Sequence, residues 1–252
     1  MLKPVDYLEK KLIKKIASTS INYQILEPND NLMVAVSGGK DSYALIYLLH
    51  KLKRRLPFKI TMTAVHVDQG QPHSNIDPLI KWLETSDFRY KIIKEDTFKI
   101  VLKQTAPGKN PCPVCARMRR GVLYTTAKKY DFNKVVLGHH MEDTLVTFMM
   151  NLFYSGKLQA MPPKYTTDDG LLQVIRPMIE IPVADIATLA KLKEFPVISC
   201  GSCGVSEDHK RKITEKLLNE LEETRPNIKS TMLTALKNIK PSHLFDNTIP
   251  HK

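Results

Sequence analysis

The stretch from Asn31 to Ser42 constrains the fold more than any other part of this sequence. It reads NLMVAVSGGKDS, an apolar run followed at once by two glycines, a lysine, an aspartate and a serine. An unbroken apolar run is typical of a parallel strand that is buried on both faces. Beyond it, apolar residues recur at helical spacing and predict a helix over 41–55: Ala44, Leu45, Leu48, Leu49 and Leu52. The stretch therefore predicts a strand, a glycine turn and a helix.

The same alternation continues along the chain. Further strands are predicted over 59–70, 89–96, 134–140 and 171–176, and further helices over 5–17, 76–86, 142–154 and 183–193. Two more apolar stripes, separated by Pro226, predict helices near the C-terminus. The alternation predicts an α/β fold, a doubly wound parallel sheet with small helical appendages at each end.

These elements suggest three parts. We expect residues 1–28 to form an N-terminal basic helical segment, since lysines lie largely off its apolar stripe. Residues 29–200 would form the α/β domain, which carries the first cysteine pair. Residues 201–252 would form a C-terminal helical segment.

Composition narrows the classes of protein to consider. Of 252 residues, 42% are hydrophobic and 25% charged, which is ordinary for a globular chain. No apolar run approaches the roughly 20 residues of a membrane span, and MLKPVDYLEKKLIKKIAS lacks the apolar segment of a signal peptide. We therefore expect a cytoplasmic protein with no membrane contact. The net charge of +12 suits a polyanionic partner such as nucleic acid.

The six residues Ser37-Gly38-Gly39-Lys40-Asp41-Ser42 suit a phosphate group. Successive glycines let backbone N–H groups point outward, the start of a helix adds a partial positive charge, and Lys40 adds a full one. The pattern is not a Walker A loop, because Lys40 is followed by Asp41 and no spaced glycine precedes it. The alternative is a plain turn capped by Asp or Ser. The complete pattern favours phosphate binding.

Polar side chains also follow two other predicted strands. Asp68 ends the strand over 59–70, and His139 ends the strand over 134–140, with Asp143 four residues further on. Ligands bind at the carboxyl ends of strands in such sheets, so all three are candidate ligand contacts. The pattern alone also allows Asp68 to be a turn residue and His139 to be an ordinary hydrogen-bonded polar group.

All four cysteines fall in two C-x-x-C pairs, Cys112 with Cys115 and Cys200 with Cys203. Three uses are open. A four-thiolate zinc site is one, although Cys115 and Cys200 lie 85 positions apart (200 − 115) and zinc ribbons separate their pairs by about 15–20 residues. A thioredoxin-like dithiol at a helix start, aided by Arg117, is the second. An iron–sulfur cluster is the third.

Basic side chains cluster after each cysteine pair. Arg117, Arg119 and Arg120 follow the first pair, and Lys210 and Arg211 follow the second. Most surface charges are simply solvated. A cluster on each side of the cysteine site is better explained by a phosphate backbone that lies near it, so these five residues are candidate RNA contacts.

With these residues in view, the chain resembles a known family. SGGKDS resembles the signature of the PP-loop ATP pyrophosphatases. Within that superfamily the sequence is similar to the bacterial tRNA 2-thiocytidine synthetases over nearly its whole length. The stretches that carry the resemblance are SGGKDSYAL, HVDQGQP, YKIIKEDT, PCPVCARMRRGVLY, LGHHMEDT, NLFYSGKLQAMPPK, VIRPM and PSHL.

The resemblance implies an ATP-dependent tRNA sulfurtransferase. It would adenylate C2 of cytidine 32 in the anticodon loop, replace the oxygen with sulfur, and release AMP and pyrophosphate. Residues 35–42 would hold ATP, with Lys40 and Asp41 acting in catalysis and with Asp68 and His139 also at the nucleotide. Asp41 and Asp143 would hold Mg²⁺. Glu142 is a second candidate, since Met141-Glu142 stands where relatives often have Arg-Asp.

The resemblance also implies a [4Fe-4S] cluster on Cys112, Cys115 and Cys200, with an open iron that carries the sulfur. Cys203 matches a cysteine that is not a usual ligand. The implied partners are tRNA and a cysteine desulfurase as sulfur donor, with a homodimer as a candidate assembly. Two alternatives remain: a lysidine-type or other PP-loop adenylating ligase, which needs no cluster, and a non-catalytic tRNA-binding module stabilised by zinc.

Overall fold

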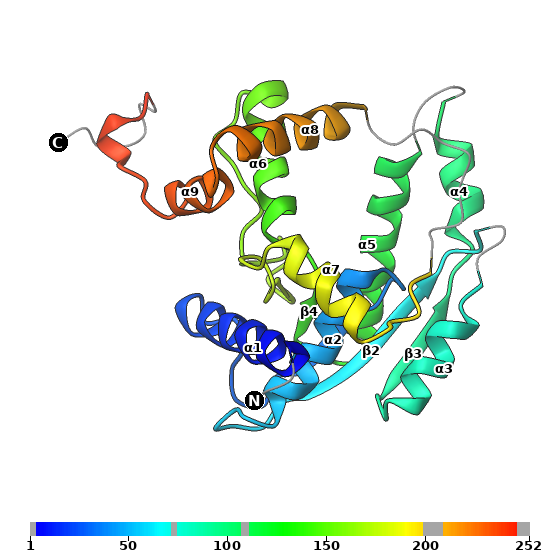
Figure 1. Cartoon of the computed structure of the whole chain (residues 1–252). Coiled ribbons are helices and arrows are strands. Elements are labelled where there is room, and N and C mark those ends of the chain that lie inside the picture. The colour runs from blue at the N-terminus through cyan, green and yellow to red at the C-terminus, as the bar shows by residue number, and fades with distance from the viewer. Residues whose placement is uncertain (1–3, 72–74, 107–110, 199–208, 246–252) are drawn as a thin grey trace. The chain divides into compact units, whose positions relative to one another are not determined.

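A computed structural model describes residues 4–71, 75–106, 111–198 and 209–245 (Figure 1). The elements are α1 (Pro4–Asn22), β1 (Asn31–Ala35), α2 (Lys40–Lys53), β2 (Thr61–Asp68), α3 (Asp77–Thr85), β3 (Tyr90–Lys94), α4 (Thr97–Gln104), α5 (Cys112–Lys129), β4 (Lys134–Val136), α6 (Met141–Ser155), β5 (Lys164–Thr166), β6 (Gln173–Ile175), α7 (Val183–Leu192), α8 (His209–Thr224), α9 (Ile228–Ala235) and the short 3₁₀ helix η1 (Pro241–His243).

The chain forms two compact units. The first combines Met1–Met141 with Pro162–His209, and the second combines Glu142–Met161 with Lys210–Lys252. The first unit holds the sheet, the glycine turn and the first cysteine pair. The second holds nearly all of α6 together with α8 and α9. The three-part division expected from the sequence (1–28, 29–200 and 201–252) stays a prediction.

Six strands form the sheet of the first unit, in the order β3-β2-β1-β4-β6-β5. All neighbouring strands run parallel except β5 and β6, which are antiparallel. From β1 the chain builds outward through β2 to β3 on one side and through β4 to β6 on the other. The order therefore reverses between β1 and β4, and ligands bind at such a reversal in open α/β sheets. The predicted α/β class is confirmed, with an antiparallel edge strand added.

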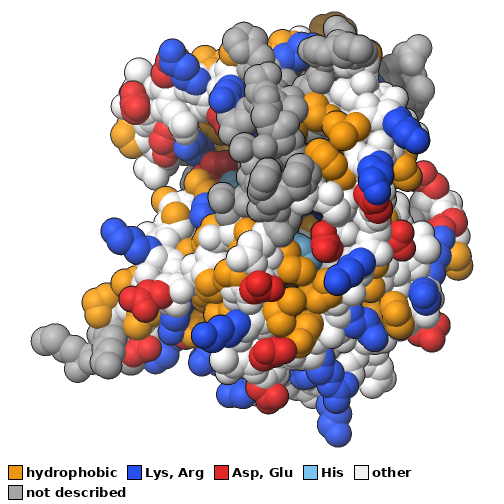
Figure 2. Space-filling model, turned by 90° about the vertical axis from the view of Figure 1, so that its right-hand side faces the viewer, with side chains coloured by type: hydrophobic (Ala, Val, Ile, Leu, Met, Phe, Trp, Pro, Cys, Tyr) orange, Lys and Arg blue, Asp and Glu red, His pale blue; other side chains and the backbone are white. Residues whose placement is uncertain are grey.

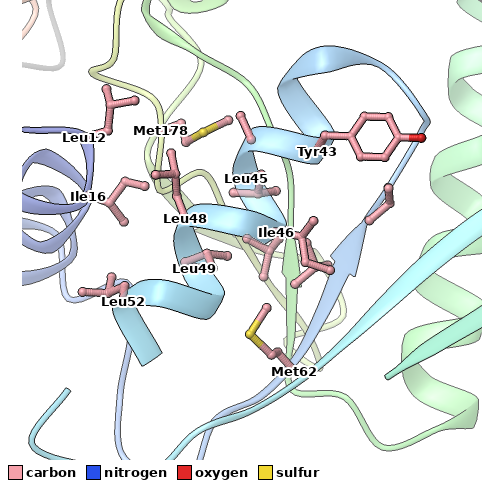
Figure 3. Packing of buried hydrophobic residues seen from close by; sticks show 14 of the residues in the cluster. Leu12, Ile16, Tyr43, Leu45, Ile46, Leu48, Leu49, Leu52, Met62 and Met178 are labelled. Carbon is pink, nitrogen blue, oxygen red and sulfur yellow. The ribbon is translucent and has the colours of Figure 1, made fainter. Parts of the chain in front are cut away.

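Helices cover both faces of this sheet because the residues of β1 alternate between two cores. Leu32 and Val34 join a cluster with apolar residues of α1, α2, α3 and α7. Met33 joins a second cluster with Leu123 and Ala127 of α5. Figure 3 shows Ile16 of α1 close to the apolar face of α2. Each fully buried aliphatic side chain contributes about 1.5–3 kcal/mol to the free energy of folding, so both layers are held mainly by such burial.

The first residue of β4 is a buried lysine that the sequence reading did not single out. Lys134 is 2% exposed, and its Nζ donates to Ile25 O at 3.0 Å, Glu27 Oε2 at 2.6 Å and Asp30 Oδ2 at 2.9 Å. A buried ammonium is tolerated only where acceptors replace its hydration. Here they join the segment between α1 and β1 to β4, and so help to fix the sheet order.

In the second unit, α8 ends at Thr224 and α9 begins at Ile228, which confirms the predicted break at Pro226. The apolar stripe expected in α8 is only partly buried. Leu218 is 1% exposed, whereas Ile213, Leu217 and Leu221 are 46%, 37% and 38% exposed. Helical periodicity predicts an apolar face, but it does not determine how much of that face is covered.

The boundaries of several elements differ from the expected ones. The strand expected over 134–140 ends at Val136, and residues 137–140 connect it to α6 without regular structure. The helices α4 and α5 and the strand β5 were not among the predicted elements, although one interpretation of the first cysteine pair placed it at a helix start. Among the described residues, no helix combines the length and the apolar character that crossing a bilayer requires.

Candidate functional site

The glycine turn after β1 is shaped by close contacts. Gly38 has φ +85°, and a Cβ there would lie 3.2 Å from the Cβ of Ile198. Ile198 also donates its N–H to Gly38 O at 2.9 Å. Gly39 is the N-cap of α2, and no described side chain caps that helix start. Uncapped N–H groups at a helix start bind anions well, so this turn can accept a phosphate group.

The polar side chains of the turn bond to one another. Ser42 Oγ donates to Gly39 O at 2.8 Å, and Ser37 Oγ accepts the Gly39 N–H at 3.4 Å. Lys40 Nζ lies 2.8 and 3.0 Å from the two carboxylate oxygens of Asp41. Both members of this pair are partly exposed, at 35% and 31%. A partly solvated pair of this kind is weak, so Lys40 and Asp41 can exchange each other for a phosphate and a metal ion.

The segment after β4 packs directly on this turn. A Cβ at Gly138 would lie 3.2 Å from the backbone oxygen of Asp41, so only glycine allows the two segments to approach this closely. His139 follows, and Arg176, just after β6, donates its Nε–H to His139 Nδ1 at 3.2 Å. The structure therefore brings His139 to the same sheet edge as the glycine turn. Sequence reasoning listed VIRPM but gave Arg176 no role.

The segment after β2 reaches the same edge. Asp68 Oδ1 accepts the N–H of Gly70 at 3.0 Å, the contact of a turn-forming aspartate. His66, two residues earlier, is 8% exposed, and its Nδ1 donates to Val36 O at 2.8 Å. Burial lowers the pKa of His66. The sequence reading missed His66, although HVDQGQP was among the stretches that carried the resemblance.

The first cysteine pair opens α5 beside this loop. Cys112 is exposed and Cys115 is half-buried. The Cys115 thiol donates to Gln69 Oε1 at 3.4 Å, and Gln71 Nε2 donates to Cys115 Sγ at 3.8 Å. Two glutamines of the β2 loop therefore hold Cys115 at the carboxyl edge of the sheet. Neither glutamine was singled out from the sequence.

The second cysteine pair, Cys200 and Cys203, lies outside the described residues. Among those that are described, no three His, Cys, Asp or Glu side chains converge to hold a metal ion. The described chain thus supplies two thiols, and the remaining ligands of any metal site must come from elsewhere. The choice among cluster, zinc and dithiol stays a prediction.

Asp143 and Arg211 were expected to serve different ligands, but they form a pair within the second unit. Arg211 Nη2 donates to Asp143 Oδ1 at 2.8 Å, and Arg211 Nε contacts Glu215 at 2.9 Å. For Asp143 to hold Mg²⁺ and Arg211 to hold RNA, each must give up this contact.

Several other expected RNA contacts have protein partners. Arg119 Nε donates to Gln69 Oε1 at 2.9 Å, and Arg117 Nη2 donates to Gln104 Oε1 at 3.2 Å. Lys210 Nζ lies 5.0 Å from the ring centre of Tyr154. Arg120 is exposed. On the face seen in Figure 2, basic side chains are interspersed with acidic ones and form no continuous patch. The net charge therefore does not by itself locate an RNA surface.

Comparison with known proteins decides the family. The PP-loop domain matches residues 8–199. The chain is 41% identical over 242 residues to a tRNA-cytidine(32) 2-sulfurtransferase of Tolumonas auensis, covering 96% of this chain and 80% of that protein. It is 45% identical over 228 residues to the protein of the same name from Cytophaga hutchinsonii, covering 90% and 79%. This chain belongs to the tRNA-cytidine(32) 2-sulfurtransferase family.

The fold agrees with this membership. Superposition on the U34-tRNA thiolase NcsA of Methanococcus maripaludis, solved with its [4Fe-4S] cluster, gives a TM-score of 0.74 at 24% identity, over 94% of this chain and 81% of that one. The NAD⁺ synthetase of Burkholderia pseudomallei gives 0.51 at 13% identity, over 90% of each chain. As a member of the 2-sulfurtransferase family, the chain is an enzyme of the transferase class, and the resemblance found in its sequence is confirmed.

Proposed function

We propose that this chain is an ATP-dependent tRNA sulfurtransferase that converts cytidine 32 of the anticodon loop to 2-thiocytidine. The oxygen on C2 of the base attacks the α-phosphorus of ATP, and pyrophosphate leaves with the electron pair of the broken bond. AMP is then attached to C2 through that oxygen. A sulfur nucleophile adds to C2, and AMP departs with the oxygen. The role of ATP is to convert a poor leaving group into a good one.

One observation carries the proposal. The glycine turn lies at the sheet edge where strand order reverses, and both Cys115 and the segment that leads to Ile198 are tied to that edge. Cys115 is bonded to the loop after β2 through Gln69. Ile198, two residues before Cys200 in the sequence, donates its N–H to Gly38 of the turn itself. A nucleotide site and a sulfur site at one edge are what adenylation followed by sulfur transfer requires.

The residues of the turn fit the phosphates of ATP. The uncapped start of α2, the backbone around Gly38 and Gly39, and Lys40 offer N–H donors and positive charge to the phosphate oxygens. The Asp41 carboxylate is a hard oxygen ligand of the kind Mg²⁺ prefers. We assign Asp41 to the metal, which would neutralise charge on the phosphates, and Asp143 is the candidate for a second carboxylate ligand.

The cysteines fit an iron–sulfur cluster by the chemistry of their donors. Thiolates are the protein ligands of [4Fe-4S] clusters, and the cluster borne by the M. maripaludis thiolase of the same fold supports this use. Cys112, Cys115 and Cys200 would hold it, and when bound it would carry the sulfur that is transferred to C2. Gln71 donates a hydrogen bond to Cys115 Sγ, which helps to orient this sulfur at the sheet edge. tRNA would be the partner substrate, and a cysteine desulfurase the sulfur donor.

The test is a complete reaction. Anaerobically prepared chain is incubated with unmodified tRNA, Mg-ATP, a cysteine desulfurase, cysteine and a dithiol reductant, which supplies the two electrons that bring persulfide sulfur to the sulfide level. The digested tRNA is then analysed by mass spectrometry. We expect 2-thiocytidine, with one AMP and one pyrophosphate released per modified base. Release of ADP, or incorporation of lysine in place of sulfur, would contradict the proposal and support another ligase.

Metal analysis tests the sulfur site separately. We expect iron and sulfide in the anaerobic protein, and their loss in Cys112→Ala, Cys115→Ala and Cys200→Ala. The matched control is Cys203→Ala, which should retain the cluster. Stoichiometric zinc without iron would support a structural site instead, and retention of iron in Cys200→Ala would refute the third ligand.

A further inference from the structure

Arg176 is a buried charge whose role the adenylation chemistry above does not explain. It follows β6 directly and is 7% exposed. Its Nη1 donates to Pro162 O at 2.8 Å, and its guanidinium carbon lies 5.2 Å from the ring centre of Tyr165. No described carboxylate pairs with it. A buried guanidinium that has only uncharged partners carries a large desolvation cost, so what it does for its neighbours needs explanation.

The third partner of Arg176 is His139. The Arg176 Nε–H points at His139 Nδ1 at 3.2 Å. A guanidinium N–H can only donate, so Nδ1 must accept with its lone pair. The ring proton of the neutral imidazole then sits on Nε2. The contact with Arg176 therefore selects one of the two tautomers of His139.

The position of His139 in the sheet gives the choice of tautomer a consequence for ligand binding. It directly follows Gly138, whose backbone packs within van der Waals distance of Asp41 in the glycine turn, and β4 is the neighbour of β1 in the sheet. The strand-order reversal and the uncapped start of α2 lie at the same edge. His139 therefore lies at the sheet edge to which the phosphates of ATP are assigned above.

We propose that Arg176 is a positioning residue, which holds His139 as the neutral Nε2–H tautomer so that His139 donates a hydrogen bond to a phosphate oxygen of the nucleotide. The positive guanidinium on Nδ1 also polarises the ring and makes Nε2–H a stronger donor. No proton is transferred. The bond strengthens as negative charge develops on the phosphate oxygens during attack at the α-phosphorus. The hydrogen bond to a phosphate oxygen rests on the proposed function, which makes ATP the substrate. The tautomer of His139 does not depend on that function.

The tautomer is measured first, because it needs no activity. The full chain is labelled with ¹⁵N-histidine, and two-bond ¹H–¹⁵N spectra are recorded at neutral pH, with His139→Gln used to assign the signal. We expect only the Nε2–H form of neutral His139 in the wild type, and a measurable fraction of the Nδ1–H form in Arg176→Met. A wild-type His139 protonated on Nδ1 would overturn the proposal. So would an unchanged tautomer in Arg176→Met.

Kinetics of tRNA-dependent pyrophosphate release then test the role. Removing one preorganised donor costs on the order of 10²-fold in kcat, so we expect about that loss in Arg176→Met, with KM for ATP changed by less than about 3-fold. In a His139→Leu background the same change should have little further effect, because the two residues act as a unit. The matched control is Arg225→Met at the exposed end of α8, which should leave kcat unchanged.

The outcomes separate this inference from the proposed function. A wild type with the Nε2–H tautomer and no ATP turnover on any tRNA supports the positioning and refutes the sulfurtransferase assignment. A loss of activity in Arg176→Met that appears only in KM refutes the positioning. If Arg176→Met does not fold, the wild-type spectrum alone still decides whether the tautomer is as stated.

Discussion

Substitution of Gly38 and Gly39, one at a time, tests whether backbone strain or phosphate chemistry accounts for the two glycines. Gly38 has φ +85°, and an added Cβ would meet the Cβ and Cδ1 of Ile198 at 3.2 Å. Gly39 has φ −79° and ψ 158°, which any residue adopts, and its Cβ would meet only Ser37 Oγ at 3.5 Å. The two glycines are adjacent in the sequence, but their local geometry differs.

The expected magnitudes follow from that geometry. A left-handed backbone costs an alanine roughly 1–2 kcal/mol, and pushing Ile198 away adds about 1 kcal/mol. Gly38→Ala should therefore lower the free energy of unfolding by about 2–3 kcal/mol. Gly39→Ala should change it little, or raise it by about 0.4–1 kcal/mol, because alanine restricts the unfolded chain. For a protein of this size the first change corresponds to a fall in Tm of roughly 4–12 °C.

The assay can be specific to the first unit. The single tryptophan, Trp82, packs against Tyr43, Phe88 and Phe195 at ring-centre distances of 4.8, 5.2 and 5.6 Å. Its fluorescence during urea unfolding therefore reports on the unit that contains the glycine turn. Equal destabilisation by both substitutions, or none by Gly38→Ala, would show that the positive φ and the contact with Ile198 do not determine the need for glycine.

Three further predictions concern stability. Lys134→Met should lower the free energy of unfolding by roughly 3–5 kcal/mol, because it leaves a buried carboxylate at Asp30 without its cation. Urea unfolding measures this free energy, and a loss below about 1 kcal/mol would contradict the prediction. Gly121→Ala should raise the Tm by stabilising α5 by about 1 kcal/mol, since an added Cβ meets nothing within 4 Å; a calorimetric scan showing a lower Tm would refute this. Burial lowers the pKa of His66 from its ordinary 6.5, so the unfolded chain takes up a proton first as the pH falls. Stability should be complete above about pH 6.5 and decline below it, and His66→Gln should reduce that dependence in urea titrations at several pH values.

The elements that the sequence predicted well are those in which local pattern and burial agree. The strand before the glycine turn, and the helix after it, were found where the apolar run and the helical spacing placed them. The C-x-x-C pair at Cys112 begins a helix, as the interpretation of the pair as a dithiol at a helix start required. The three-residue strand β5 had no such signal, because so few residues show too little period to stand out.

Much of the candidate site could not be predicted from patterns of residues that are close together in the sequence. Arg119 and Arg211 were both read as RNA contacts, and each has a protein partner far away in the chain: Gln69 for Arg119, and Asp143 for Arg211. A charged side chain gives the same signal in a sequence whether it faces solvent or another residue. The proposed roles of these arginines therefore depend on contacts that the sequence could not show.

By itself the sequence determined the family, the α/β class and the glycine turn, because these depend on residues that are adjacent or periodic along the chain. Only the tertiary structure decided that Lys134 is a buried cation, that Cys115 is tied to Gln69, and that Arg176 contacts His139. In each case the partners lie 37 to 109 positions apart. The physical reason is that side-chain contacts of this kind form only when strands and helices from separate parts of the chain are packed together.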